Sequence, residues 1–103
     1  MRTYRVLKAA SYRIDEIYRY SWDQWGEEQA KRYISGLFEC FDKIAKREIL
    51  WRAIPAEYEV TGYYTSYEKH FIYWRELSDG YVGIATVLHQ SMSIKNRLQE
   101  DLY

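Results

Sequence analysis

The 103-residue sequence has a single cysteine, Cys40, and this scarcity excludes two kinds of small protein. One cysteine cannot form an intrachain disulfide, and it cannot supply a four-cysteine zinc site. No cluster of His, Cys and Asp residues has metal-ligand spacing either, so we expect neither a metal ion nor another cofactor. Cys40 lies beside an apolar stripe, and we interpret it as a small packing residue.

Proline, glycine and long apolar runs are also scarce. One proline and five glycines leave no low-complexity tract, and the glycines form no phosphate-binding loop. No apolar run approaches 18 residues, and no export signal follows the first residues. We therefore expect a cytoplasmic protein without a membrane partner, folded as a single domain over residues 1–103.

Neither positive nor negative charge is in excess, whereas aromatic side chains are abundant. The 15 basic and 15 acidic residues cancel, which argues against a protein that binds nucleic acid by itself. The 12 tyrosines and four tryptophans can serve a small core or a partner-binding surface. We expect several of these aromatic residues to be exposed in the isolated chain, among Trp22, Trp25, Tyr63, Tyr64, Tyr67 and Trp74.

Hydrophobic periodicity divides the N-terminal half into a strand and two helices. Residues 3–8 alternate and are rich in strand-forming side chains. Residues 10–25 and 27–46 carry apolar side chains at helical spacing, and the second stripe is continuous. Because Gly26 alone separates the two segments, the pattern predicts an antiparallel helical hairpin.

The C-terminal half reads as strands followed by a short helix. The loop 47–57 holds the only proline, and we expect Trp51 within it to pack on the core. Three strand-forming runs follow, with a hairpin signal at Ser78-Asp79-Gly80 between the last two; they span 58–66, 69–77 and 81–89. The middle run has large side chains on both faces, which suits a central strand.

Ser93 is a suitable N-cap for a final helix, and the whole order predicts the α+β class.

Short motifs accompany this order of elements along nearly the whole chain. They are Ala9-Ala10, Asp15-Glu16-Ile17-Tyr18, Trp25-Gly26-Glu27-Glu28-Gln29-Ala30, Tyr33 with Leu37, Gly62-Tyr63, Lys69-His70-Phe71-Ile72-Tyr73-Trp74-Arg75 and Val87-Leu88-His89-Gln90-Ser91-Met92-Ser93. The ordered set resembles the ParE branch of the RelE/ParE toxins. Two departures stand out: Glu68-Lys69-His70 replaces a common Gly-Arg-His, and Ser91 and Ser93 replace an Arg and an Asp near the end.

The resemblance implies a fold and a pair of partners. The fold is an N-terminal strand and an antiparallel helical hairpin packed on a small antiparallel sheet, with a short C-terminal helix. ParE-like toxins bind DNA gyrase and stabilise its cleaved-DNA complex. A ParD-like antitoxin neutralises them in a hetero-oligomer, wraps the toxin with a flexible segment, and itself binds the operator, so operator DNA is only an indirect partner.

Two residue sets follow as predictions from this resemblance and from the aromatic pattern. The antitoxin-binding set comprises Tyr18, Trp22, Trp25, Tyr33, Tyr64, Tyr73 and Trp74. The target-binding set comprises Arg75, His89, Met92 and Arg97.

The alternative function is that of a RelE-type ribosome-dependent mRNA endoribonuclease. Members of that branch place an Arg early in the central strand and a Tyr near the end of the last one, where this chain has His70 and Gln90. An endoribonuclease would then have to use His70, Arg75 and His89. The competing interpretation is that His89 packs at a strand end while Arg75 pairs with a carboxylate such as Glu76 or Glu57.

We favour a binding toxin without its own catalytic site. A third alternative is a domain that binds its antitoxin but no longer inhibits a target.

Overall fold

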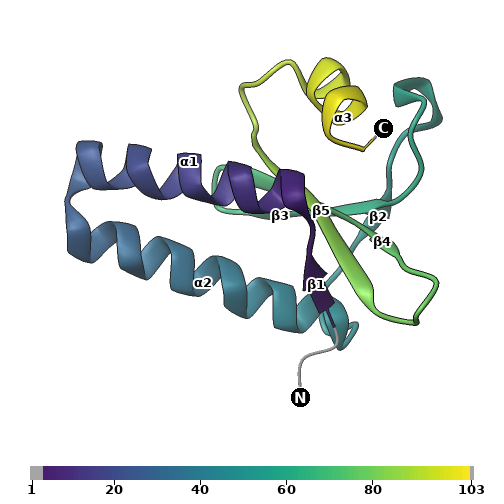
Figure 1. Cartoon of the computed structure of the whole chain (residues 1–103), viewed down its shortest axis with the longest axis horizontal. Coiled ribbons are helices and arrows are strands. Elements are labelled where there is room, and N and C mark those ends of the chain that lie inside the picture. The colour runs from purple at the N-terminus through teal and green to yellow at the C-terminus, as the bar shows by residue number, and fades with distance from the viewer. Residues whose placement is uncertain (1–3, 103) are drawn as a thin grey trace.

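In the computed structural model of the chain, residues 4–102 are described, and they form one sheet with three helices (Figure 1). The elements in chain order are β1 (Tyr4–Val6), α1 (Lys8–Trp25), α2 (Glu27–Ala45), β2 (Arg52–Ala53), the 3₁₀ turn η1 (Ala56–Tyr58), β3 (Tyr63–Tyr67), β4 (His70–Glu76), β5 (Val82–His89) and α3 (Ile94–Leu102). The α+β class is confirmed, as is the predicted order of a strand, two helices, three strands and a final helix. Strand β2 and the turn η1 are additions that fall largely in the segment expected to be a loop. Thr3, where we expected the first strand to begin, lies outside the described residues.

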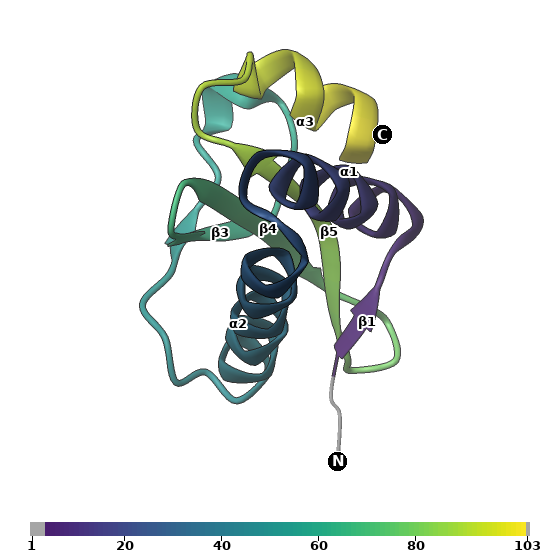
Figure 2. The same cartoon turned by 90° about the vertical axis from the view of Figure 1, so that its left-hand side faces the viewer.

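The sheet has five strands in the order β1-β5-β4-β3-β2. Strand β1 runs parallel to β5, with Tyr4 opposite Val82, and the other neighbours are antiparallel. A parallel pair needs a long crossover, which the helical hairpin supplies between β1 and the rest of the sheet. The chain therefore carries α1 and α2 onto one face of the sheet (Figures 1 and 2).

Apolar side chains cover both faces of the central strand β4. On the face toward the hairpin, Ile72 and Trp74 pack with Phe41 and other side chains of α1 and α2. On the opposite face, Tyr73 packs with Leu98 of α3 and with residues near η1. Strand β4 is thus buried between two layers, as its large side chains on both faces predicted.

The hairpin turns at Gly26 and reaches beyond the sheet. Gly26 has a φ of 92°, a conformation that glycine adopts without strain, and its N–H donates to the carbonyl of Trp22 at 2.9 Å. Figure 1 shows the tip of the hairpin standing clear of the strands. Among residues 4–102, no helix has the length and apolar character needed to cross a bilayer.

The segment before β3 departs from the expected strand. We expected a strand from residue 58, but it begins at Tyr63, because η1 occupies residues 56–58 and Glu59 adopts a left-handed φ of 61°. Trp51 was expected to pack on the core, and that prediction is wrong. Its side chain is 44% exposed and lies against the guanidinium of Arg47, because the adjoining residues 52–53 form the outermost strand of the sheet.

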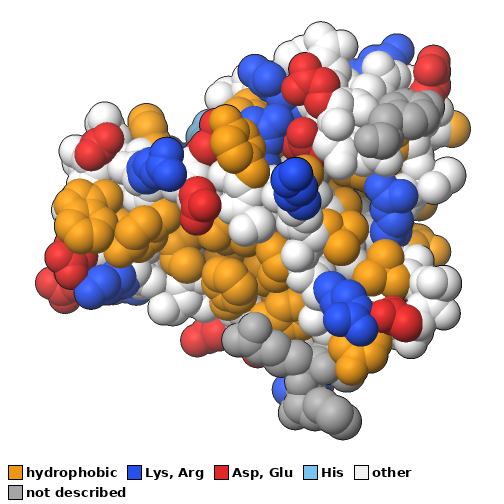
Figure 3. Space-filling view, viewed as in Figure 1, with side chains coloured by type: hydrophobic (Ala, Val, Ile, Leu, Met, Phe, Trp, Pro, Cys, Tyr) orange, Lys and Arg blue, Asp and Glu red, His pale blue; other side chains and the backbone are white. Residues whose placement is uncertain are grey.

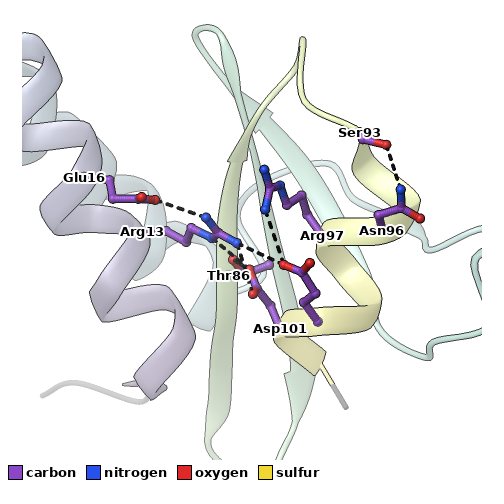
Figure 4. A network of polar contacts seen from close by, with 8 residues as sticks. Arg13, Glu16, Thr86, Ser93, Asn96, Arg97 and Asp101 are labelled. Carbon is purple, nitrogen blue, oxygen red and sulfur yellow. Dashed lines mark hydrogen bonds and ion pairs between the residues drawn. The ribbon is translucent and has the colours of Figure 1, made fainter.

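A buried ion pair fixes α3 against the rest of the fold (Figure 4). The Nε of Arg13 on α1 donates to Asp101 Oδ2 at 3.0 Å, and Thr86 on β5 donates to the same oxygen at 2.8 Å. The hydrogen bond with Asp101 is the largest cause raising the pKa of Arg13, and Glu16 adds a second bond at 3.1 Å. One carboxylate thereby joins α1, β5 and α3.

Removing that carboxylate should destabilise the fold. In Asp101→Asn the buried guanidinium of Arg13 keeps the carboxylates of Glu16 at 3.1 Å and of the exposed Glu100 at 4.0 Å, so we expect the free energy of unfolding to decrease by about 2–3 kcal/mol. The matched control is Glu28→Gln, whose exposed carboxylate pairs with the exposed Arg32 at 3.4 Å and should contribute less than about 0.5 kcal/mol. Urea denaturation measures both, and equal stabilities of the two variants would contradict the role of Asp101.

Candidate functional site

The outer surface of the hairpin exposes an apolar band. Tyr18 and Trp22 on α1 contact edge to face with ring centroids 5.6 Å apart, and Trp22 is 44% exposed. Ile34 and Phe38 on α2 are half-buried. We call these four residues the hairpin face, and Figure 3, seen from the same side as Figure 1, shows hydrophobic side chains gathered over the two helices.

A groove of about 900 Å³ lies on the other side of α1. Its walls are the C-terminal half of α1, the start of α2, the β3–β4 turn and the loop between β5 and α3. Figure 2 looks onto the tip of the hairpin, with the strands and α3 beyond it. Tyr20 and Trp25 line the groove from α1, and Trp25 is 64% exposed at the hairpin tip, so it adjoins both surfaces.

Two histidines lie side by side in this groove. His70 on β4 is the partner of His89 on β5, and their ring centroids are 5.1 Å apart. The hydroxyl of Tyr33 on α2 lies 2.6 Å from His70 Nδ1. Burial, and secondarily the neighbouring His89, lowers the pKa of His70 to about 4, so His70 is neutral at physiological pH.

The hydrogen bonds of both rings assign the same tautomer. The backbone N–H of Ser91 donates to His89 Nδ1 at 3.0 Å, so a neutral His89 carries its proton on Nε2. Burial raises the pKa of Tyr33 to about 12, so its hydroxyl keeps its proton; because the backbone N–H of Lys69 donates to the hydroxyl oxygen, we assign the hydroxyl proton to the bond with His70 Nδ1. The proton of neutral His70 then also lies on Nε2.

The structure divides the predicted antitoxin-binding set among three places. Tyr18 and Trp22 belong to the hairpin face, and Trp25 and Tyr33 line the groove. Tyr64 lies on the opposite face of the sheet, stacked on Tyr73 with ring centroids 5.7 Å apart.

Tyr73 and Trp74 do not offer a partner any surface, and we correct this part of the prediction. They are only 2% and 1% exposed, because β4 is covered on both faces. Their large rings belong to the two cores.

The predicted target-binding set surrounds α3 without forming one cluster. His89 and Met92 line the groove. Arg97 lies on α3 and pairs with Glu100 at 3.4 Å. Arg75 lies beneath α3, where it donates to the carbonyl of Leu102 at 3.0 Å while its Nε has no partner.

The environment of Arg75 differs from both predictions, the ion pair with a carboxylate and the catalytic cluster with His70 and His89. We expected it to pair with Glu76 or Glu57, but it bonds a backbone carbonyl, and Glu76 pairs with Arg47 at 2.7 Å. It lies five residues from His70 on β4, roughly 17 Å along the strand, and its contact with α3 places it on the opposite face. The structure does not bring Arg75 to the two histidines.

Comparison with known proteins places this geometry in a family. Residues 4–94 match the family model described as "ParE toxin of type II toxin-antitoxin system, parDE". "Toxin ParE1" of Caulobacter vibrioides is 32% identical over 99 residues, covering 95% of this chain and 99% of the relative. "Toxin ParE1" of Mycobacterium tuberculosis is 29% identical over 97 residues, covering 92% and 96%.

A solved structure has the same fold. It is titled "Chromosomal ParDE TA system from P. aeruginosa" and superposes with a TM-score of 0.68 at 15% sequence identity. The match covers 86% of this chain and 96% of the other.

The lowered pKa of His70 predicts that the fold loses stability in acid. The pKa of His70 is about 4 when folded and near 6.5 when unfolded, so the unfolded chain binds the proton first as the pH falls. The contribution of neutral His70 to the free energy of unfolding is fully present above about pH 6.5, and roughly 2–3 kcal/mol of it should be lost by pH 4. His70→Asn should show a flatter pH dependence of the free energy of unfolding, and identical slopes for both proteins would refute this assignment.

Proposed function

Because the chain belongs to the ParE toxins of type II toxin–antitoxin systems, we propose that a ParD-like antitoxin binds its hairpin face and groove. We further propose that the toxin, when free of antitoxin, inhibits DNA gyrase in the cytoplasm by binding it. Operator DNA would be contacted by the antitoxin alone, which agrees with the zero net charge of this chain.

The exposed apolar hairpin face carries this proposal. Large side chains such as Trp22 and Trp25 are exposed on a protein whose core is already filled by Trp74, Phe41 and their neighbours. Contiguous exposed apolar surface of this kind is characteristic of an interaction site. An amphipathic segment that covers two facing helices buries its apolar side chains there, a common mode of peptide recognition.

The position of Trp25 supports a continuous path for the antitoxin. It stands at the hairpin tip and lines the groove, while Trp22 lies one helical turn before it on α1. A flexible segment that covers the hairpin face can pass Trp25 and enter the groove. Such a path leads the segment to His89 and Met92, which belong to the predicted target-binding set.

The target-binding residues that remain outside the groove are Arg97 and Arg75. Arg97 is solvent-accessible on α3, so we propose that it contacts the target directly. The Arg75 side chain is covered by α3, and its bond to Leu102 gives it a positioning role for that helix. The endoribonuclease alternative is not favoured, because it requires Arg75 beside His70 and His89.

Truncating the exposed tryptophan should weaken antitoxin binding. We expect Trp22→Ala to cost about 2 kcal/mol of binding free energy, since buried Trp anchors dominate many interfaces. Tyr12→Ala is the matched control, because Tyr12 is 61% exposed on the same helix but stands outside both surfaces. Calorimetric titration with the antitoxin measures the dissociation constants, and equal losses in the two variants would count against the hairpin face.

Incubation with gyrase, supercoiled DNA and ATP tests the target. Linear DNA with gyrase covalently attached is the expected product, and Arg97→Ala should form less of it while binding the antitoxin as tightly as the wild type. Translating ribosomes form the parallel assay, in which codon-positioned mRNA cuts with intact DNA would favour the endoribonuclease. A chain that binds antitoxin but inhibits neither target would be the inactive domain.

A further inference from the structure

Two ring N–H groups in the groove have no protein acceptor. The tautomers of His70 and His89 place both protons on Nε2, and the structure gives neither Nε2 atom a hydrogen-bond partner within residues 4–102. Within the same residues, the sole buried side-chain nitrogen or oxygen without a partner is Arg75 Nε. Both Nε2 atoms therefore reach solvent, and because both histidines line the groove, they open onto it.

This arrangement argues for a donor pair and against a base or a metal site. A general base or a metal ligand needs a lone pair on the open nitrogen. Here the lone pairs lie on Nδ1 and accept bonds from Tyr33 and from the Ser91 N–H. No group of three or more metal-ligating side chains occurs in the described part of the chain. The open nitrogens can thus donate two hydrogen bonds without any change of protonation.

The residues around the histidine pair favour an anionic hydrogen-bond acceptor that is part of a polypeptide. Lys69 lines the groove and has no ion pair within the described range, while the carboxylate of Glu16 is paired with Arg13. Glu68 also lines the groove, which disfavours a multiply charged ligand such as a nucleic-acid backbone. Tyr20 and Trp25 supply apolar walls for the side chains that flank the acceptor in a peptide.

We propose that His70 and His89 together bind the carboxylate of an Asp or Glu side chain in the antitoxin segment that enters the groove. A carboxylate fits because its two oxygens can each accept one of the two Nε2–H bonds. This inference rests on the proposed function, since it names the chemistry by which the antitoxin occupies the groove. The seated segment covers His89 and Met92, so binding of antitoxin and of target at these residues excludes one another.

Binding of a carboxylate makes the affinity depend on pH. A bound anion stabilises the imidazolium form of His70, so the pKa of His70, about 4 in the free toxin, is higher in the complex. The complex should consequently tighten as the pH falls toward the raised pKa of His70. Of the other groups that line the groove, Tyr33 keeps its proton because burial raises its pKa to about 12; Lys69, Glu68, His89 and the Arg13–Glu16 pair also face it.

Two nearly isosteric substitutions distinguish the role of the Nε2 donor from that of the Nδ1 acceptor in each ring. Asn places an amide oxygen near the position of Nδ1, so it can accept the bonds from Tyr33 or Ser91 but offers no donor at Nε2. Gln places its NH₂ near Nε2 and so retains the donor. The double variant H70N/H89N is the test, and H70Q/H89Q is its matched control, with thermal unfolding of both showing that they are folded.

The probe is the full-length ParD-like antitoxin that the proposed function names as the partner of this chain. H70N/H89N should bind it at least about tenfold more weakly than the wild type, because a hydrogen bond to a charged group contributes a factor of that order. H70Q/H89Q should stay within about threefold. Replacing the antitoxin's acidic residues singly by their amides should identify one whose loss weakens the wild type but not H70N/H89N.

The binding results distinguish a failure of the carboxylate site from a failure of the proposed function. If the wild type binds this protein and H70N/H89N binds it equally well, the carboxylate site is wrong while the proposed function stands. If the wild type does not bind it at all, the proposed function fails. If instead H70N/H89N loses affinity for a single-stranded oligonucleotide and keeps its affinity for the antitoxin, the occupant is a phosphate and the proposal is overturned.

Discussion

The buried carboxylate of Asp101 is the constraint on which the arrangement of the functional surfaces depends. It accepts hydrogen bonds from Arg13 on α1 and Thr86 on β5, so α1, which is far away in sequence, meets β5 and α3 at one oxygen (Figure 4). A guanidinium that is almost entirely buried is costly unless it is paired, and this pairing therefore holds α3 in one position. The loop before α3 forms a wall of the groove, and Arg13 itself lines it. The same ion pair thus fixes α3 and shapes the groove beside it.

The second constraint is a bulge between β4 and β5, which determines what faces the groove. Near the turn the strands pair Glu76 with Val82, but after the irregularity at Tyr73 and Trp74 the register is shifted by one residue. Without that shift His70 would stand opposite Leu88, and the side chains of β5 would exchange faces beyond this point. The extra residue therefore brings His89 next to His70. A bulge leaves no signal in the pattern of residues, so the sequence could predict both strands and their hairpin but not this pair.

The sequence predicted the elements better than the surfaces, for a physical reason. Helical periodicity and the single residue Gly26 determine the hairpin locally, and its expected bounds agree with the structure to within two residues. Exposure of an aromatic side chain depends on which elements cover it, and this is a property of the whole fold. Trp22 and Trp25 stand on a hairpin that reaches beyond the sheet and are exposed, whereas Trp74 on the central strand is buried. Arg75 illustrates the same limit, because its acceptor is a backbone carbonyl of α3.

The buried histidine pair also bears on which ligands the groove would bind. His70 is kept neutral by desolvation and by its neighbour, so it adds a hydrogen-bond donor to the groove without adding a fixed positive charge of its own. A fixed charge there would attract the phosphates of nucleic acid as readily as a carboxylate. Neutral donors discriminate by geometry, because only an acceptor with suitably spaced oxygens satisfies both rings. Burial of the pair, which the fold achieves by packing Tyr33 against His70, is in this sense a source of specificity as well as a cost to stability.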